Sequence, residues 1–359
     1  MMKELVVNLH IHSNYSDGSG THEEIAKAAQ QAGLDVVIVT DHNVLIQSVD
    51  RVYKNGDHTM LFMTGEEIHD RNRQPLKNHL LAIGHTTELS NFAKDPQLLI
   101  DKARQAGALT FIAHPYEDEL QLIGEPDISW VDWQVEHYHG IEIWNHLSEL
   151  KSVSPNWGKL LLNVFFPHLY SKGPNPKTLQ KWDSLSRPNR KIMAIGGSDS
   201  HALIIKKSFF KKIVFPYIFH FQCVNNHLLV PNELSGNLLS DRQMVLDALR
   251  QGHSFVGYDL PACTKGFRFT AQGNSQDAIM GDSIALDTSV TLQIRLPHRA
   301  DCRLLWNGKV IKQWQSQEIC SLTVNEAGVY RVECSIQYLG QSRGWIFSNP
   351  IYVINKDNL

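Results

Sequence analysis

Apolar runs and stretches of helical periodicity alternate along the first 200 residues. Thr21, followed three positions later by Glu24, has the signature of a capping box, so a helix is expected from there to Gln31, ending near Gly33. Strands that alternate with helices predict an α/β fold with a mainly parallel sheet. About seven strand–helix units of this kind would close the sheet into a barrel. The other predicted helices are 96–105 and 240–251, and the predicted strands are 5–11, 36–40, 61–64, 80–83, 109–113, 140–144 and 191–195.

The pattern changes near residue 258. Alternating runs such as Val290–Leu296 and Tyr330–Ile336 are separated by turn signals such as Asn307-Gly308. They predict a small antiparallel β-sandwich over 259–359, after a first domain of 1–258. Residues 145–190 are less regular and rich in Trp, Pro and Lys, and we interpret them as an insertion over the mouth of the barrel.

Composition excludes some classes of protein. With 34 Lys and Arg against 37 Asp and Glu, the 359-residue chain shows no bulk electrostatic preference for nucleic acid or an anionic membrane, although a local basic groove is compatible with it. No stretch approaches the roughly 20 apolar residues of a membrane span, so no membrane partner is expected. Five cysteines without a CxxC pair, and no export signal, favour reduced thiols and a cytoplasmic location.

Polar residues that can bind metals recur at the ends of the apolar runs. In barrels of the predicted type, the chemistry lies at the carboxyl ends of the strands. Imidazole and carboxylate groups are the ligands that hold and activate divalent metals. The candidates are His10, His12, Asp17, His42, Glu67, His79, His114, Asp199 and His201.

Each motif has an ordinary explanation when taken alone. His10 and His12 share one face of a strand, but such a pair often only packs or decorates it. Asp17 precedes a glycine and could simply form a turn. Glu66 and Glu67 should point to opposite sides of their strand, and spacing alone does not choose between them. Recurrence of the motifs at one topological position favours a shared metal centre.

In their order along the chain, these motifs resemble the polymerase-and-histidinol-phosphatase (PHP) family of metal hydrolases. The motifs are HxHSxxSDG at 10–18, TDHN at 40–43, GxE at 65–67, a His before an apolar strand at 79, HP at 114–115 and SDSH at 198–201. The resemblance covers about residues 4–258 and implies a distorted (β/α)7 TIM-like barrel.

The resemblance also implies a set of ligands for up to three divalent metals, which could be Zn, Mn or Fe. The GxE pattern selects Glu67 rather than Glu66. The first metal would take His10, His12, Glu67 and Asp199, the second would share Glu67 and add His79 and His114, and the third would take Asp17, His42 and His201.

Further segments are similar to the carbaryl-hydrolase-like (CehA/McbA) branch of that family, which carries a β-sandwich after its metal domain. They include Ile141–Asn145, Ala248–Val256 and Trp345–Val353. The implied activities are hydrolysis of phosphate esters and of carboxylic or carbamic esters.

A hydroxide that bridges two metals is the expected nucleophile, with Glu67, Asp199 and His201 as the central catalytic residues. The leading hypothesis is a phosphoesterase on a small phosphate ester or nucleotide, because a third metal suits a phosphoryl group. A carbamate or carboxylic ester hydrolase is the second, and a catalytically inert binding module is the third. No basic stripe with interleaved aromatic residues predicts a nucleic-acid partner.

Overall fold

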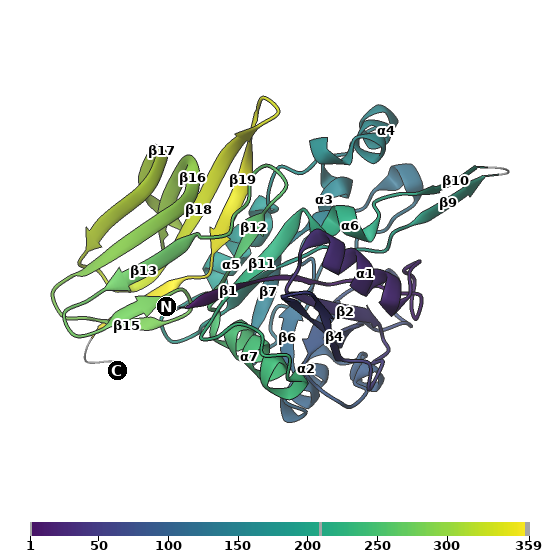
Figure 1. Ribbon diagram of the computed structural model, residues 1–359, viewed down its shortest axis with the longest axis horizontal. Coiled ribbons are helices and arrows are strands. Elements are labelled where there is room, and N and C mark those ends of the chain that lie inside the picture. The colour runs from purple at the N-terminus through teal and green to yellow at the C-terminus, as the bar shows by residue number, and fades with distance from the viewer. Residues whose placement is uncertain (1, 208–209, 356–359) are drawn as a thin grey trace.

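The computed structural model describes residues 2–207 and 210–355 and is a mixed α/β protein (Figure 1). Helices surround the strands of the first part of the chain, whereas the part from β13 onward consists of strands. The strands of the first part are β1 (Lys3–Leu9), β2 (Val36–His42), β3 (Arg51–Asn55), β4 (His58–Ile68), β5 (Leu80–Ile83), β6 (Leu109–Ile112), β7 (Gly140–Asn145), β8 (Met193–Gly197), β11 (Val224–Val230) and β12 (Ser254–Tyr258).

These strands follow the order β8-β7-β6-β5-β4-β2-β1-β11-β12, with β3 on the edge of β4. The expected mainly parallel, closed (β/α)7 barrel is wrong in two respects. Strand β5 is antiparallel to both β4 and β6, and β11 is antiparallel to both β1 and β12. In addition, no strand ladder among the described residues joins β8 to β1. Their carboxyl ends are connected instead by an isolated bridge between Ile11 and Ser200 and by a hydrogen bond from the backbone N–H of Ser198 to the carbonyl of Leu9.

The reversal at β5 has a local cause. A parallel connection needs a crossover of a dozen or more residues, usually a helix. The segment between Ile68 and Leu80 holds only turns, so β5 returns beside β4 in the opposite direction.

The predicted helices form with nearly the expected bounds. Helix α1 (His22–Ala32) begins at the capping box of Thr21 and Glu24 and ends at Gly33, whose φ of 74° is left-handed. Helix α2 (Pro96–Gln105) matches its prediction, and α7 (Leu238–Gln251) begins two residues early because Asn237 caps it. Within the described residues, no helix combines the length and apolarity that a membrane crossing requires.

The region 145–190 is more regular than expected. It forms α3 (His146–Ser152), α4 (Trp157–Phe165) and α5 (Pro176–Leu185), each capped by an asparagine side chain that accepts a backbone N–H. These helices are short, and Pro155, Pro167 and Pro174 interrupt the hydrophobic pattern between them, which hides their periodicity. The remaining short elements are η1 (Ser90–Phe92), η2 (Gln121–Ile123), η3 (Pro167–Leu169), β9 (Ile204–Lys207), β10 (Phe210–Ile213) and α6 (Tyr217–Phe221).

The last part of the chain encloses its own apolar core. The first half of β16 pairs with β13 and its second half with β18, so the sheet folds around Phe269, Leu304 and Trp345. Most of its pairs are antiparallel, but β15 and β20 are parallel. Its strands are β13 (Arg268–Gln272), β14 (Asp277–Ile279), β15 (Ser283–Leu286), β16 (Val290–Trp306), β17 (Lys309–Val324), β18 (Gly328–Tyr338), β19 (Gln341–Ser348) and β20 (Ile351–Asn355).

The two parts of the chain share hydrogen bonds. Strand β12 pairs with β19, and the Asn349 side chain both accepts from the backbone N–H of Ala194 and donates to its carbonyl. A boundary at 258/259 therefore cuts across a continuous sheet, and it stays a prediction.

Candidate metal centre

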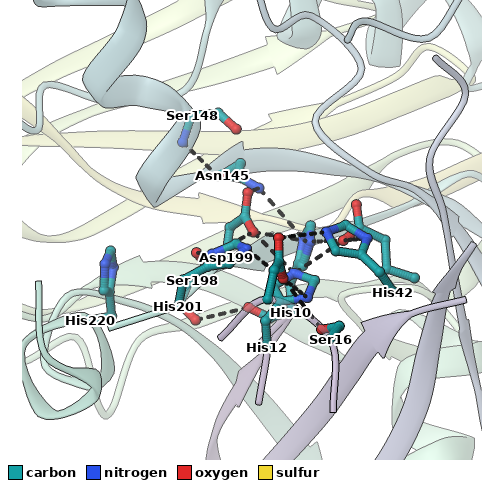
Figure 2. Close-up of polar contacts among 12 residues, drawn as sticks. His10, His12, Ser16, His42, Asn145, Ser148, Ser198, Asp199, His201 and His220 are labelled. Carbon is teal, nitrogen blue, oxygen red and sulfur yellow. Dashed lines mark hydrogen bonds and ion pairs between the residues drawn. The ribbon is translucent and has the colours of Figure 1, made fainter. Parts of the chain in front are cut away.

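The strand ends bring all nine predicted ligands to one edge of the sheet. His10 and His12 follow β1, His42 ends β2, Glu67 lies near the end of β4 and His114 follows β6. His79 precedes β5, whose reversed direction places its beginning at the same edge. The segment Asp199–His201 follows β8 and is held against β1 by hydrogen bonds between the backbones of Ser200 and both His10 and His12. Figure 2 shows the side chains of His10, His12, His42, Asp199 and His201 converging.

One group of four buried residues surrounds a single point. The Nε2 atoms of His10 and His12 lie 3.0 and 3.1 Å from Oε2 of Glu67. The same nitrogens lie 3.5 and 3.2 Å from Oδ1 of Asp199. Two imidazoles and two carboxylates at these distances form a set that could hold a metal ion.

A second group uses the other oxygen of Glu67. Its Oε1 lies 2.7 Å from Nδ1 of His79 and 3.0 Å from Nε2 of His114. The carboxylate of Glu67 thus faces both groups with different oxygens, which is the arrangement that a bridging carboxylate requires.

The third group is more exposed. Asp17 lies on the loop after β1, and its carboxylate is 3.6 Å from Nε2 of His42 and 3.3 Å from Nε2 of His201. Nδ1 of His12 approaches the same carboxylate to 3.7 Å, so the His12 ring lies between the first and third groups.

The groups share strong electrostatic coupling. Burial opposes charge on Glu67 and Asp199, yet the imidazole of His10 and its neighbours hold the pKa of both carboxyls well below the usual range. Burial also disfavours imidazolium, but Asp199 and Glu67 raise the pKa of His12 to about 10. Burial lowers the pKa of His42 to about 3 despite the nearby Glu67. The centre therefore favours positive charge, although its histidines do not all become protonated.

Buried polar atoms without hydrogen-bond partners mark the same place. An unsatisfied buried donor or acceptor costs about 1–3 kcal/mol, so several side by side call for a ligand. Divalent cations would satisfy them, and the mixture of imidazole and carboxylate donors fits Zn, Mn or Fe. Among the described residues these atoms include Nε2 of His10, both ring nitrogens of His12, Nδ1 of His42, Oε2 of Glu67, Nε2 of His79 and Nδ1 of His114.

Backbone strain occurs at three of these residues. His10, His114 and Asp199 have left-handed φ values of 63°, 24° and 50°. A residue other than glycine in this region costs on the order of 1–3 kcal/mol, and such strain clusters at functional sites. Here the bend at each strand end turns an imidazole or carboxylate inward.

Two residues that the sequence did not single out support the ligands. Oε1 of Glu142 lies 2.7 Å from Nδ1 of His10, and its Oε2 accepts the backbone N–H of His114. Asn145 donates to Glu142 and to Asp199 while its own oxygen caps α3 (Figure 2). A buried acid within the apolar run 140–144 is the signal that could have revealed Glu142. Asp41, which the TDHN motif suggested as a residue that could orient a ligand, accepts hydrogen bonds from the backbone N–H and the hydroxyl of Ser13.

His69 and Glu117 are also close enough to take part. His69 groups with His42 and His79, and Glu117 groups with His114 and Asp199. His69 lies two positions after Glu67, on the same side of the chain as that acid, and this spacing could have identified it. Glu117 forms an ion pair of 2.5 Å with Lys151 and contacts Ser148.

A cavity of about 480 Å³ opens beside the centre. The residues that line it include His114, Glu117, Asn145, Lys151 and Lys172. A small molecule in this cavity would reach the candidate metal ligands.

Comparisons with known proteins agree with the ligand pattern. The model of the PHP domain matches residues 8–124, which contain seven of the nine candidates but not Asp199 or His201. An uncharacterized protein of Methanocaldococcus jannaschii is 23% identical over 129 residues, covering 33% of this chain and 72% of that protein. The similarity to the PHP domain is thus confined to about the first third of the chain.

Two solved structures have low similarity to the chain. A two-domain protein of Bacteroides vulgatus that contains a predicted PHP-like metal-dependent phosphoesterase matches with 16% identity and a TM-score of 0.45, covering 97% of this chain and 95% of the other. An amidohydrolase from Chromobacterium violaceum matches with 15% identity and a TM-score of 0.28, covering 54% and 87%. Similarity at these scores does not indicate a function for this chain.

Proposed function

We propose that this protein is a metal-dependent hydrolase with three divalent ions, and that it is a phosphoesterase acting on a small phosphate ester or a nucleotide. One observation carries the proposal: the two oxygens of Glu67 face two separate sets of imidazole nitrogens, and a third group lies beside them. The ligands would be those of the three groups, with Glu67, Asp199 and His201 central to catalysis.

Each residue of the centre would have a distinct role. Glu67 would fix the spacing between two cations, and Asp199 and His12 would complete the first site. Glu142 would hold His10 with its Nε2 free to bind metal, because Nδ1 is already taken. When bound, the cations would lower the pKa of a water from 15.7 toward about 7 and offset charge on the substrate oxygens.

The third group favours a phosphate ester over a carboxylic or carbamic ester. A carbonyl group presents one oxygen to be stabilised, whereas a phosphoryl group presents two or more that do not bridge. Asp17, His42 and His201 would hold a cation for the additional oxygen. Similarity to the carbaryl-hydrolase-like branch keeps the carbamate reaction as the alternative to be tested beside it.

The experiment combines metal analysis with a substrate panel. Purified protein should contain up to three equivalents of Zn, Mn or Fe, and exhaustive chelation should abolish turnover. Among p-nitrophenyl phosphate, bis(p-nitrophenyl) phosphate, p-nitrophenyl acetate and naphthyl methylcarbamate, the phosphate esters should react fastest. A preference for acetate or carbamate would assign the alternative activity. Turnover that resists chelation would refute the metal-dependent mechanism, and no turnover of any ester would favour an inert binding module.

A further inference from the structure

Two segments of the chain are basic although the chain as a whole is acidic. Residues 151–182 and 200–232 together contain nine Lys and neither Asp nor Glu. The remainder of the chain contains the other 25 Lys and Arg and all 37 Asp and Glu. The net charge of −3 therefore hides a strong asymmetry.

The two segments lie together in the fold. Leu160 and Tyr170 of the first segment share one apolar cluster with Val214 and Phe215 of the second. In Figure 1, α4 and the β9–β10 hairpin project from the same end of the molecule, away from the strands β13–β20. The basic segments are thus neighbours in the structure, and Lys151 and Lys177 of the first segment are paired with Glu117 and Asp118 outside it.

Helix α4 has large apolar side chains on its solvent side. Leu160 and Asn163 are buried, whereas Trp157, Leu161, Leu162 and Phe166 are 55%, 50%, 38% and 50% exposed. These four side chains lie away from the side of the helix that Leu160 and Asn163 bury, and we call the surface that they form the outer face of α4. A surface helix normally directs polar residues toward water. Leu203, Ile204 and Ile213, at the base of the hairpin, are also exposed.

We propose that the outer face of α4 docks onto an anionic lipid bilayer. Trp, Leu and Phe would enter the boundary between headgroups and acyl chains, while nearby lysines such as Lys159 would contact lipid phosphates. Lysine stems can cover apolar surface while their charged ends stay in water. The proposal concerns surface binding without a spanning helix, and it does not depend on the activity of the metal centre.

Charge and side-chain type separate this partner from two others. In a symmetric dimer through this face, the basic segments of one copy would approach those of the other, and like charges would repel. A nucleic acid would match the charge, and its bases could stack on Trp157 and Phe166, but Leu161 and Leu162 on the same face would offer it no stacking partner. A bilayer complements both the positive charge and the aliphatic surface.

Cosedimentation of the full-length protein with vesicles tests the proposal. The vesicles would be pure phosphatidylcholine, or phosphatidylcholine with about 30% phosphatidylglycerol, in about 0.1 M salt. We expect binding to the anionic vesicles alone, and weaker binding in about 1 M salt, where the Debye length falls to about 3 Å. The combined variant Trp157→Ser, Leu161→Gln and Phe166→Ser should lower the partition coefficient at least about tenfold.

Matched controls separate this face from general hydrophobicity and charge. The double variant Leu239→Gln and Ile319→Gln removes apolar side chains that are 77% and 76% exposed elsewhere, and it should bind vesicles as the wild type does. Lys159→Glu on α4 should weaken binding, whereas Lys309→Glu on β17 should not.

Four outcomes would overturn the proposal. The first is that the protein is not enriched on anionic vesicles, and the second is that the outer-face variant binds them as well as the wild type does. The third is that the wild type binds no vesicles and is a dimer, whereas the outer-face variant is a monomer. The fourth is that the protein binds single-stranded RNA more strongly than vesicles. The third outcome would assign the face to a second copy of the chain, and the fourth would assign the region to nucleic acid.

Discussion

Glu66 and Glu67 are neighbours on β4, and their carboxylates lie on opposite sides of the strand. Oε2 of Glu66 lies 2.8 Å from Nε2 of His85 and accepts the backbone N–H of Leu89, whereas Glu67 contacts the imidazoles of the metal centre. Strand alternation requires the two acids to diverge, but only the fold determines which side holds the histidines.

Substitution of the two acids should therefore have opposite consequences. Glu67→Gln removes a charge from the carboxylate shared by two groups, so metal content and ester turnover should both fall to background. Glu66→Gln should leave both nearly intact, because burial and Glu88 raise the pKa of Glu66 to about 9 and a neutral amide resembles the protonated acid. Elemental analysis and p-nitrophenol release measure the outcome. Loss of metal in Glu66→Gln with metal retained in Glu67→Gln would reverse the assignment.

Glu142 should control metal affinity without binding metal itself. It orients the ring of His10, and loss of such a partner costs roughly 10–100-fold in metal affinity. Glu142→Gln should show that decrease in competition with a chromogenic chelator.

Gly197→Ala should act on the same contact, since a Cβ there would lie 1.7 Å from Oε1 of Glu142. Gly158→Ala is the control, because its Cβ meets only an Asn156 side-chain atom at 3.4 Å. Unchanged affinity in both Glu142→Gln and Gly197→Ala would show that His10 does not need this support.

Substitution of Asp17 should affect metal binding in the third group alone. Its carboxylate makes no contact with Glu67 in the structure, so Asp17→Asn should lower the metal content by one equivalent and leave two. Turnover of phosphate esters should fall about 10²–10³-fold, as when one oxyanion donor is removed, while a carboxylic ester should lose less. Mass spectrometry under native conditions counts the ions, and an unchanged count would show that Asp17 is not a ligand.

A buried ion cluster away from the metal centre should make stability depend on pH. His227 lies 2.9 Å from Glu4 and 3.1 Å from Asp259. Although burial opposes its charge, Asp259 and Glu4 raise the pKa of His227 from 6.5 to about 9. A raised pKa means that the folded state holds a proton that the unfolded state releases. The stabilisation is therefore complete below pH 6.5 and disappears as the pH rises through about 9.

His227→Gln should lower the free energy of unfolding by about 1.5–3 kcal/mol at pH 6, because it removes the charged partner that the two buried acids share. The loss is partial, since Glu4 keeps its ion pair with Arg268 and Asp259 keeps hydrogen bonds from Asn225 and Thr264. The difference from wild type should shrink between pH 6.5 and 9. Urea denaturation with chelator in every sample measures it. His58→Gln, which affects a more exposed pair with Asp35, should change stability less and is the control. A constant difference across this pH range would mean that His227 is not charged in the fold.

The sequence indicated the candidate metal ligands more accurately than it indicated the arrangement of the strands. Imidazoles and carboxylates that interrupt apolar runs are visible one motif at a time, and their placement at strand ends predicted that they would meet. Helices α1 and α2 were equally readable, because a capping box and an N-terminal Asp-Pro are local signals. The direction of β5 could not be predicted from the sequence, because β5 has only four residues and its direction depends on which strands it pairs with.

By itself, the sequence determined helices α1, α2 and α7, seven strands of the first part of the chain and the nine candidate ligands. It also required the two acids of β4 to face opposite sides of the strand. Only the tertiary structure decided that β5 runs antiparallel, that Glu142 and Asn145 support the centre, and that two basic segments adjoin the exposed face of α4. Local periodicity, capping and side-chain alternation involve residues a few positions apart. The contact of Glu142 with His10 spans 132 residues, and it exists only once separate strands have packed into one sheet.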